Sequence, residues 1–151
     1  MAIFLVQHGI SLTKNQDPEK GLSEKGRFDT LKIAEVAKSY KIPVSKIVHS
    51  GKKRAAQTAV IFNETLEIKN PCEQIDKLNP LDDVKVFSNG IESLSNVMVV
   101  GHLPFMEKLV SYLTTNSEDL RVYKFQNSGI VCLDYEDGTW FIKWTLNPNI
   151  S

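Results

Sequence analysis

Ala2-Ile3-Phe4-Leu5-Val6 is an apolar run that leads directly into Gln7-His8-Gly9, close to the start of the chain. The β-branched and aromatic side chains of this run predict a short buried strand. His8 then follows the carboxyl end of that strand, the edge at which open α/β sheets bind ligands. A second Gly-His pair, Gly101-His102, follows a second apolar run, Val97-Met98-Val99-Val100. We therefore expect the two imidazoles to face each other across one pocket.

Helical and extended patterns alternate along the first half of the chain. A polar loop over Ile10–Gly21 precedes Ser23, which is a good N-cap for an amphipathic helix that ends before Pro43. A short strand is expected over Ser45–His49 and a second helix over Lys52–Glu64. The segment from 66 to 81 is ambiguous between a short strand and an extended connection.

The second half continues the alternation and ends differently. Asp82 and Asp83 are expected to cap a weak helix that runs to about Leu94, before the strand over 97–100. The next helix carries its apolar stripe at Met106, Leu109, Val110 and Leu113. Two extended segments, 129–135 and 140–146, flank Glu136-Asp137-Gly138-Thr139, a sequence typical of a tight hairpin turn. The pattern predicts a three-layer α/β/α sandwich with a mostly parallel central sheet and a C-terminal antiparallel hairpin.

Composition limits the classes of function. The chain has 151 residues, 42% hydrophobic and 24% charged, which is ordinary for one globular domain spanning 1–151. Lys+Arg and Asp+Glu balance at 18 each, so no global basic field attracts nucleic acid or an anionic membrane. The apolar N-terminal run is too short for a signal peptide, and no segment approaches a membrane span. Cys72 and Cys132 have no motif spacing and are expected to be reduced thiols. We expect a cytoplasmic protein and, without heptads or a long apolar edge, a monomer.

The candidate site combines a nucleophile with anion-binding groups. A neutral histidine that donates one ring N–H to a backbone carbonyl keeps its other nitrogen free to attack phosphorus. Arg54, near the start of the helix after the second strand, can bind a phosphoryl group with its guanidinium fork. Backbone N–H groups near Ser50 add a helix N-terminus, and His102 can donate a hydrogen bond or act as a cation there. Taken alone, His8 also fits a packing or capping residue, Arg54 a solvated helix residue, and Gly101-His102 a plain strand-to-helix turn. His49 either borders the pocket or packs in the core or at the rim, and the second interpretation is at least as good.

In these residues the chain resembles the histidine phosphatase superfamily, which has the phosphoglycerate-mutase-like fold, and within it the short SixA-type phosphohistidine phosphatases. The family's opening Arg-His-Gly motif corresponds to Gln7-His8-Gly9, and its Leu-Thr/Ser…Gly segment to Leu22-Ser23-Glu24-Lys25-Gly26. Its Ser…Arg-Ala…Thr signature corresponds to the stretch from Ser50 through Arg54-Ala55 to Thr58, and its Val-Gly-His motif to Val100-Gly101-His102. The match spans essentially the whole chain, because the terminal segment from Asn127 to Pro148 also looks like the short branch.

The resemblance implies a two-step reaction without a metal or organic cofactor. His8 would become phosphohistidine, water would then release phosphate, and Arg54 and His102 would bind the phosphoryl oxygens, with Gln7, Gly9 and Ser50 lining the phosphate site. The chain lacks the long insertion before Gly101 with which other branches cover the pocket. An uncovered pocket suits a phosphate on a protein surface, such as a phosphohistidine domain.

Gln7 departs from the family pattern, because the residue before the nucleophile is ordinarily arginine. Losing a charge-assisted contact to the transition state costs about 2–4 kcal/mol, or two to three orders of magnitude in rate. Lys52 or Lys53 are candidates to compensate. Gln7 keeps a catalytically weakened phosphate-binding or interaction module open as an alternative function, beside a phosphatase for a small phosphorylated metabolite.

The proton donor to the leaving group is not fixed by the sequence. The candidates are Asp17 and Glu19 in the first loop, and Asp82 and Asp83 nearer the family's usual acidic position. For Asp82 and Asp83, helix capping is an equally good interpretation.

Overall fold

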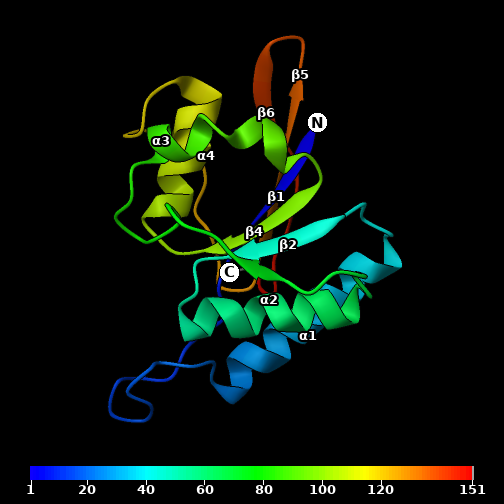
Figure 1. The fold of residues 1–151 in the computed structure, drawn as a ribbon, viewed down its shortest axis with the longest axis vertical. Coiled ribbons are helices and arrows are strands. Elements are labelled where there is room, and N and C mark those ends of the chain that lie inside the picture. Colours follow the sequence, from blue (N-terminus) through cyan, green and yellow to red (C-terminus); the bar gives the residue numbers. More distant parts are fainter. Residues whose placement is uncertain (151) are drawn as a thin grey trace.

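A computed structural model describes residues 1–150 as a six-stranded sheet with helices on both faces (Figure 1). The strands are β1 (Ala2–Gln7), β2 (Lys46–His49), β3 (Glu73–Gln74), β4 (Val97–Gly101), β5 (Ile130–Glu136) and β6 (Thr139–Leu146). The order across the sheet is β3-β2-β4-β1-β5-β6. The first four are mutually parallel, whereas β5 runs antiparallel to β1 and to β6. The predicted fold class is confirmed.

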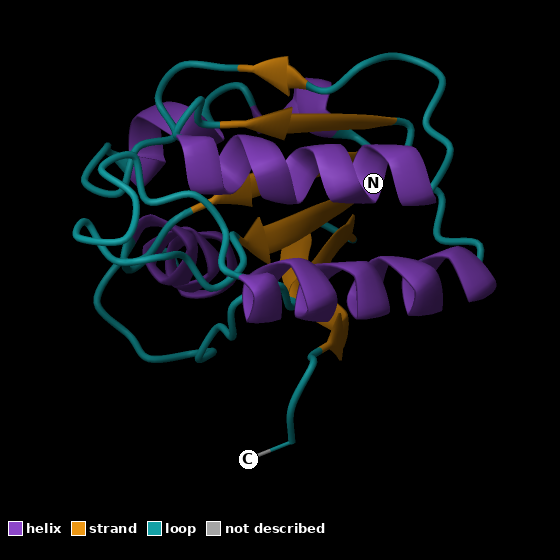
Figure 2. Cartoon of the chain, turned by 90° about the horizontal axis from the view of Figure 1, so that it is seen from below, coloured by secondary structure: helices purple, strands orange, loops and turns teal. Residues whose placement is uncertain are grey.

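The helices divide between the two faces of the sheet. α1 (Glu24–Ser39) and α2 (Lys53–Thr65) lie side by side on one face, as Figure 2 shows from that side. α3 (Val84–Ser88), a 3₁₀ turn over Ile91–Leu94 and α4 (Phe105–Thr115) lie on the other. No helix among the residues that the structure describes is long and apolar enough to cross a membrane.

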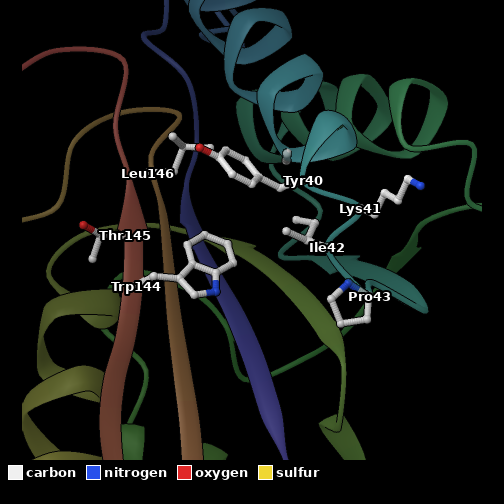
Figure 3. A pocket seen from close by; sticks show the side chains of 8 residues that line it. Tyr40, Lys41, Ile42, Pro43, Trp144, Thr145 and Leu146 are labelled. Atoms are coloured by element: carbon white, nitrogen blue, oxygen red, sulfur yellow. The ribbon is translucent and has the colours of Figure 1, made fainter.

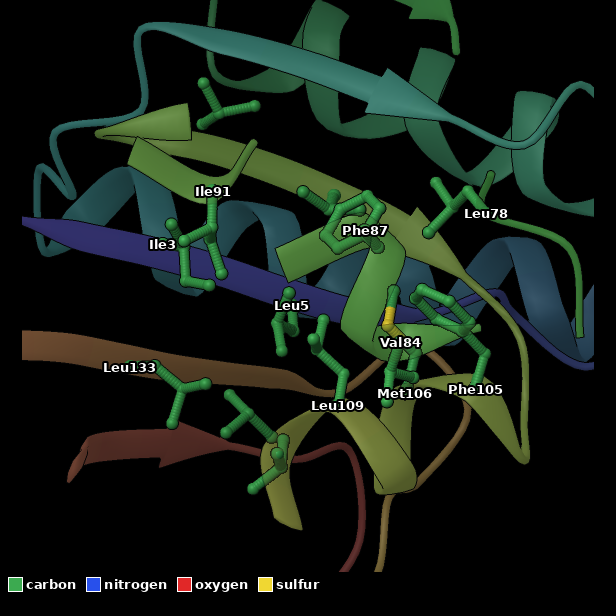
Figure 4. Close-up of a cluster of buried hydrophobic side chains, with 14 of the residues drawn as sticks. Ile3, Leu5, Leu78, Val84, Phe87, Ile91, Phe105, Met106, Leu109 and Leu133 are labelled. Atoms are coloured by element: carbon green, nitrogen blue, oxygen red, sulfur yellow. The ribbon is translucent and has the colours of Figure 1, made fainter. Parts of the chain in front are cut away.

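Alternation along β1 divides the core between the two faces. Ile3 and Leu5 pack on the α4 side, in the cluster of Figure 4, whereas Phe4 and Val6 pack on the side of α1 and α2. All four side chains are at most 1% exposed, as expected for a central strand that is covered on both faces. The predicted apolar run is therefore a fully buried strand.

The register of the parallel strands brings their carboxyl ends together. Gln7 of β1 pairs with Gly101 of β4, and His49 of β2 pairs with Val100. The residues that follow, His8 and His102, consequently leave the sheet at the same edge, and the His8 backbone N–H donates to the Gly101 carbonyl at 3.0 Å.

Several local expectations are confirmed in detail. Ser23 caps α1, because its Oγ accepts from the Gly26 N–H at 3.0 Å. A Cβ at Gly26 would overlap the carbonyl oxygen of Ile10, so the glycine allows the first loop to lie directly against the helix. Asp137 and Gly138 have φ of 53° and 79°, the two positive values that a tight hairpin turn needs. Cys72 and Cys132 are both free thiols.

The prediction of one continuous helix from the Asp82-Asp83 pair to Leu94 is wrong. Its regular part ends at Ser88, and the chain resumes as a 3₁₀ turn only at Ile91. Asn89-Gly90 interrupts the helix, consistent with the high conformational entropy of glycine. Pro104 is the N-cap of α4.

Candidate active site

His8 has the contacts of a neutral histidine with one ring nitrogen committed to the backbone. Its Nδ1 lies 2.7 Å from the carbonyl oxygen of Gly9, which can only accept, so Nδ1 carries the proton. Its Nε2 accepts a hydrogen bond from Nε of Arg54 at 3.3 Å. The lone pair of Nε2 therefore points toward the guanidinium, where a bound phosphoryl group would take its place.

Burial controls the protonation of His8. It lowers the pKa of the imidazole from 6.5 to about 4, against a smaller raising effect of the Gly9 carbonyl. The positive charges of Arg54 and Lys20 lower the pKa further. The side chain is therefore unprotonated at neutral pH, the state that a nucleophile requires.

His102 faces His8 across the strand ends. The two ring centroids are 5.0 Å apart, and the ring planes are inclined at 50°. His102 is 1% exposed, and its Nε2 lies 2.6 Å from Oγ of Ser50, which comes from the end of β2. Burial lowers the pKa of His102 to about 3, and the charges of nearby basic groups add to the effect. Of the two roles expected for His102, the neutral hydrogen-bond donor fits this environment.

The structure thus brings His8, Arg54, His102 and Ser50 together, as the sequence led us to expect. Arg54 is the second residue of α2, at the helix N-terminus. The backbone N–H of Lys52, the N-cap of α2, donates to Oγ of Ser50 at 3.3 Å. Ser50 therefore links this helix start to His102. The site holds basic and polar groups suited to an anion.

Gly9 is fixed by residues to which the sequence assigned no role. Thr58 accepts from the Gly9 N–H at 2.9 Å and donates to the Arg54 carbonyl at 2.7 Å. Asn127 donates through Nδ2 to the His8 carbonyl at 2.9 Å. Thr58 lies in the Ser…Arg-Ala…Thr signature, and that motif was the signal that could have pointed to it.

Gln7 lies at the last position of β1 and adds no charge to the site. Its Oε1 is buried, and it has no hydrogen-bond partner among residues 1–150. Of the two lysines considered as replacements for the missing arginine, Lys53 is engaged by carboxylates, and the charge of Lys52 is among those that lower the pKa of His102. Lys53 pairs with Asp17 at 2.8 Å and with Glu19 at 3.6 Å, whereas Lys52 is exposed.

The four candidate proton donors have other contacts. Asp17 pairs with Lys53, whose hydrogen bond lowers the pKa of the carboxyl to about 2, so this side chain is ionised in the working range of pH. Asp83 is the N-cap of α3 and accepts from the Lys85 N–H, whereas Asp82 accepts from the Asn79 N–H. Within residues 1–150, no hydrogen bond or ion pair joins these three carboxylates or Glu19 to the two facing histidines. Their role as acids stays a prediction.

His49 is buried at the end of β2, and its role is local. Its Nδ1 accepts from the Gly51 N–H at 3.1 Å, across the turn that leads into α2. Burial lowers its pKa as well. Of the two placements left open for His49, this contact favours a supporting position in the turn.

Metal binding and an apolar surface groove are two other features of the described chain that bear on function. In the described part of the chain, no cluster of three or more His, Cys, Asp or Glu side chains could hold a metal ion. An apolar groove between the end of α1 and β6 has Tyr40 and Trp144 among its lining residues (Figure 3). None of the residues around His8 lines that groove.

The chain is similar to known phosphatases in sequence and in fold. The phosphohistidine phosphatase SixA of Escherichia coli strain K12 is 27% identical over 154 residues, covering 98% of this chain and 94% of SixA. A solved structure of the protein histidine phosphatase SixA complexed with tungstate has a TM-score of 0.85 and 25% identity, covering 98% of this chain and 97% of that one. The alpha-ribazole phosphatase from Shigella flexneri shares the fold, with a TM-score of 0.80 at 12% identity, covering 100% of this chain and 98% of that one. No protein-family model matches the chain.

The fold is that of the histidine phosphatase superfamily, to which these structural neighbours belong. The similarity to SixA extends over the length of both chains and includes the sequence as well as the fold. This chain is a homologue of the phosphohistidine phosphatase SixA, and the resemblance indicated by the motifs is confirmed.

Proposed function

We propose that this protein is a phosphatase that removes the phosphoryl group from phosphohistidine, with His8 as the nucleophile. The observation that carries the proposal is the His8 ring itself. Nδ1 donates to the Gly9 carbonyl at 2.7 Å, and Nε2 faces Arg54 at 3.3 Å. This arrangement fixes the tautomer whose free nitrogen can attack phosphorus. The homology with SixA supports the same activity and substrate class.

In the first step, Nε2 of His8 attacks phosphorus and forms a new P–N bond. The P–N bond of the substrate breaks, and its electron pair stays on the substrate imidazole, which takes up a proton from solvent water. Arg54 exchanges its contact with Nε2 for the phosphoryl oxygens, over which the charge of the transition state is spread. His102, held by Ser50, donates a hydrogen bond to one of those oxygens.

In the second step, water attacks the phosphorus of phosphorylated His8. The P–N electron pair returns to Nε2, the attacking water loses a proton to solvent, and inorganic phosphate leaves. The hydrogen bond from Nδ1 to Gly9 is retained throughout and stabilises the positively charged phosphoimidazole between the two steps. The scheme uses only side chains of this chain and water.

A phosphorylated protein is the partner that best suits the site. The connection between α2 and β4 spans residues 66–96, and its regular elements are a two-residue strand, a five-residue helix and a short 3₁₀ turn, without the long insertion with which other branches cover the pocket. We propose that residues 1–151 act as one catalytic domain, as a monomer, in the cytoplasm, on a phosphohistidine presented at a partner's surface.

The test is phosphate release from a phosphohistidine-containing protein domain under single-turnover conditions, without added metal. The wild type is compared with His8→Ala and with His49→Asn, a histidine control that keeps a hydrogen-bond acceptor for the Gly51 N–H. Release by the wild type and by His49→Asn, with none by His8→Ala, is the expected result. Equal release by the wild type and His8→Ala would overturn the mechanism.

A further inference from the structure

The loop between β1 and α1 is fastened to the turn of α2 that carries Arg54. Asp17 pairs with Lys53 at 2.8 Å, and the Leu22 N–H donates to Oε1 of Gln57 at 2.7 Å. Lys53 and Gln57 are one helical turn apart, with Arg54 between them in sequence. The loop residues between the two anchors are therefore held beside the active site.

Lys20 lies between those anchors in an uncommon backbone conformation. Its φ is 53°, in the left-handed region that residues other than glycine rarely adopt. The Lys20 N–H donates to the Asp17 carbonyl at 2.9 Å, and the Gly21 N–H donates to the Asp17 carboxylate, also at 2.9 Å. This tight turn fixes the direction in which the Lys20 side chain leaves the loop.

Lys20 has no acidic partner in its own loop. The two acidic residues of the loop, Asp17 and Glu19, both turn to Lys53. Lys20 is half-buried, and no carboxylate of residues 1–150 lies within 4.0 Å of its Nζ. A partly buried ammonium group without a counter-ion is unfavourable unless an anion binds beside it.

The loop that carries Lys20 packs against the residue after the nucleophile, because a Cβ at Gly9 would lie 3.0 Å from Cδ2 of Leu22. After burial, which has the largest effect, the positive charges of Arg54 and Lys20 both lower the pKa of His8. Position 7, in contrast, supplies no charge, and Oε1 of Gln7 is buried and without a partner in the described chain. A phosphoryl group bound at His8 would therefore meet Arg54 from α2 and Lys20 from the loop, neither of which forms an ion pair with a carboxylate of residues 1–150.

We propose that Lys20 binds a phosphoryl oxygen of the substrate and supplies, from the β1–α1 loop, the positive charge that Gln7 does not provide. The proposal rests on the proposed function, because the anion it describes is the phosphoryl group on its way to His8. It also assigns the Asp17–Lys53 ion pair a purpose: the pair holds the loop, and so Lys20, against α2.

The test compares Lys20→Met, Lys20→Arg and the control Lys14→Met, which removes an exposed lysine from the same loop. We expect Lys20→Met to lower kcat/KM about a hundredfold, the usual effect of losing one contact to the developing charge. Its dissociation constant for inorganic phosphate should rise, whereas Lys20→Arg and Lys14→Met should stay close to the wild type. A histidine NMR titration should show a higher pKa for His8 in Lys20→Met, a change that a purely structural role would not produce.

A double variant, Gln7→Arg with Lys20→Met, tests directly whether Lys20 supplies the charge that an arginine at position 7 would supply. Gln7→Arg should restore much of the rate lost in Lys20→Met, because both side chains would supply charge to the same phosphoryl group. Unchanged phosphate affinity and an unchanged His8 titration in Lys20→Met would overturn the proposal. A wild type that binds inorganic phosphate through Lys20 but shows no His8-dependent release would instead overturn the proposed function and leave the Lys20 assignment standing.

Discussion

The ionisation of His8 can be tested through folding stability, because its pKa differs between the folded and unfolded chain. The pKa is 6.5 for an unperturbed imidazole and about 4 in the folded protein, chiefly because of burial. This pKa difference corresponds to a free-energy cost of at most about 3 kcal/mol for protonating His8 in the folded protein relative to the unfolded chain. Between the two values the unfolded chain binds more protons, so stability must fall as the pH falls through this window.

The variant His8→Gln removes this contribution and keeps a polar side chain of similar length. Urea unfolding of the wild type and the variant between pH 4 and pH 7.5 gives the difference in free energy of unfolding at each pH. The wild type should lose up to about 3 kcal/mol more than His8→Gln over that range. The other titrating groups are common to the two proteins and largely cancel in the comparison, apart from His102, whose pKa the charge of His8 helps to lower.

Parallel pH dependences would refute the reasoning, because they would mean that His8 titrates alike in the folded and unfolded states. The same pKa should govern activity, since only neutral His8 can attack. The acid limb of kcat/KM should therefore lie well below pH 6.5, and an inflection near 6.5 would also contradict the burial argument.

Three substitutions test the other parts of the site. Gln7→Arg in the otherwise wild-type protein should raise kcat by much less than the two to three orders of magnitude that a charge-assisted contact of about 2–4 kcal/mol is worth, because Lys20 already supplies charge to the phosphoryl group; a gain of the full size in steady-state assays would mean that Lys20 does not compensate for Gln7. Ser50→Ala removes the partner at 2.6 Å from His102 Nε2, so kcat should fall more than KM rises, and unchanged kcat would exclude a positioning role. Thr58→Val leaves the buried Gly9 N–H unpaired and should cost about 1–3 kcal/mol of stability in urea unfolding, with no loss if water replaces the hydroxyl.

The parts of the fold that the sequence predicts well are those set by local pattern. The apolar run before His8 and the one before His102 mark β1 and β4, because strands covered on both faces need continuous apolar residues. Ser23 and the Asp137-Gly138 turn are recognisable since capping and positive φ depend on the residue itself. The interruption at Gly90 is the counterexample, because the adjoining segments keep enough apolar pattern to resemble one helix.

The site could be predicted in its main residues but not in its supporting contacts. The carboxyl ends of β1 and β4 lie next to each other because Gln7 pairs with Gly101. This register is a property of the sheet and is not determined by either strand alone. Whether a charged residue is free or paired depends on the same tertiary arrangement. Lys53, a candidate for compensation, is engaged by Asp17, whereas Lys20 has no local pattern that would single it out.

The central claim is that phosphate passes through a covalent bond to Nε2 of His8. Rapid-quench mass spectrometry of the wild type mixed with a phosphohistidine domain tests it most directly, with the quench kept alkaline so that phosphohistidine survives. We expect a transient form of the protein that carries one phosphoryl group, located on His8 by peptide fragmentation and absent from His8→Ala. Phosphate release at the wild-type rate with no phosphorylated protein at any time, or with the phosphoryl group on another residue, would contradict it.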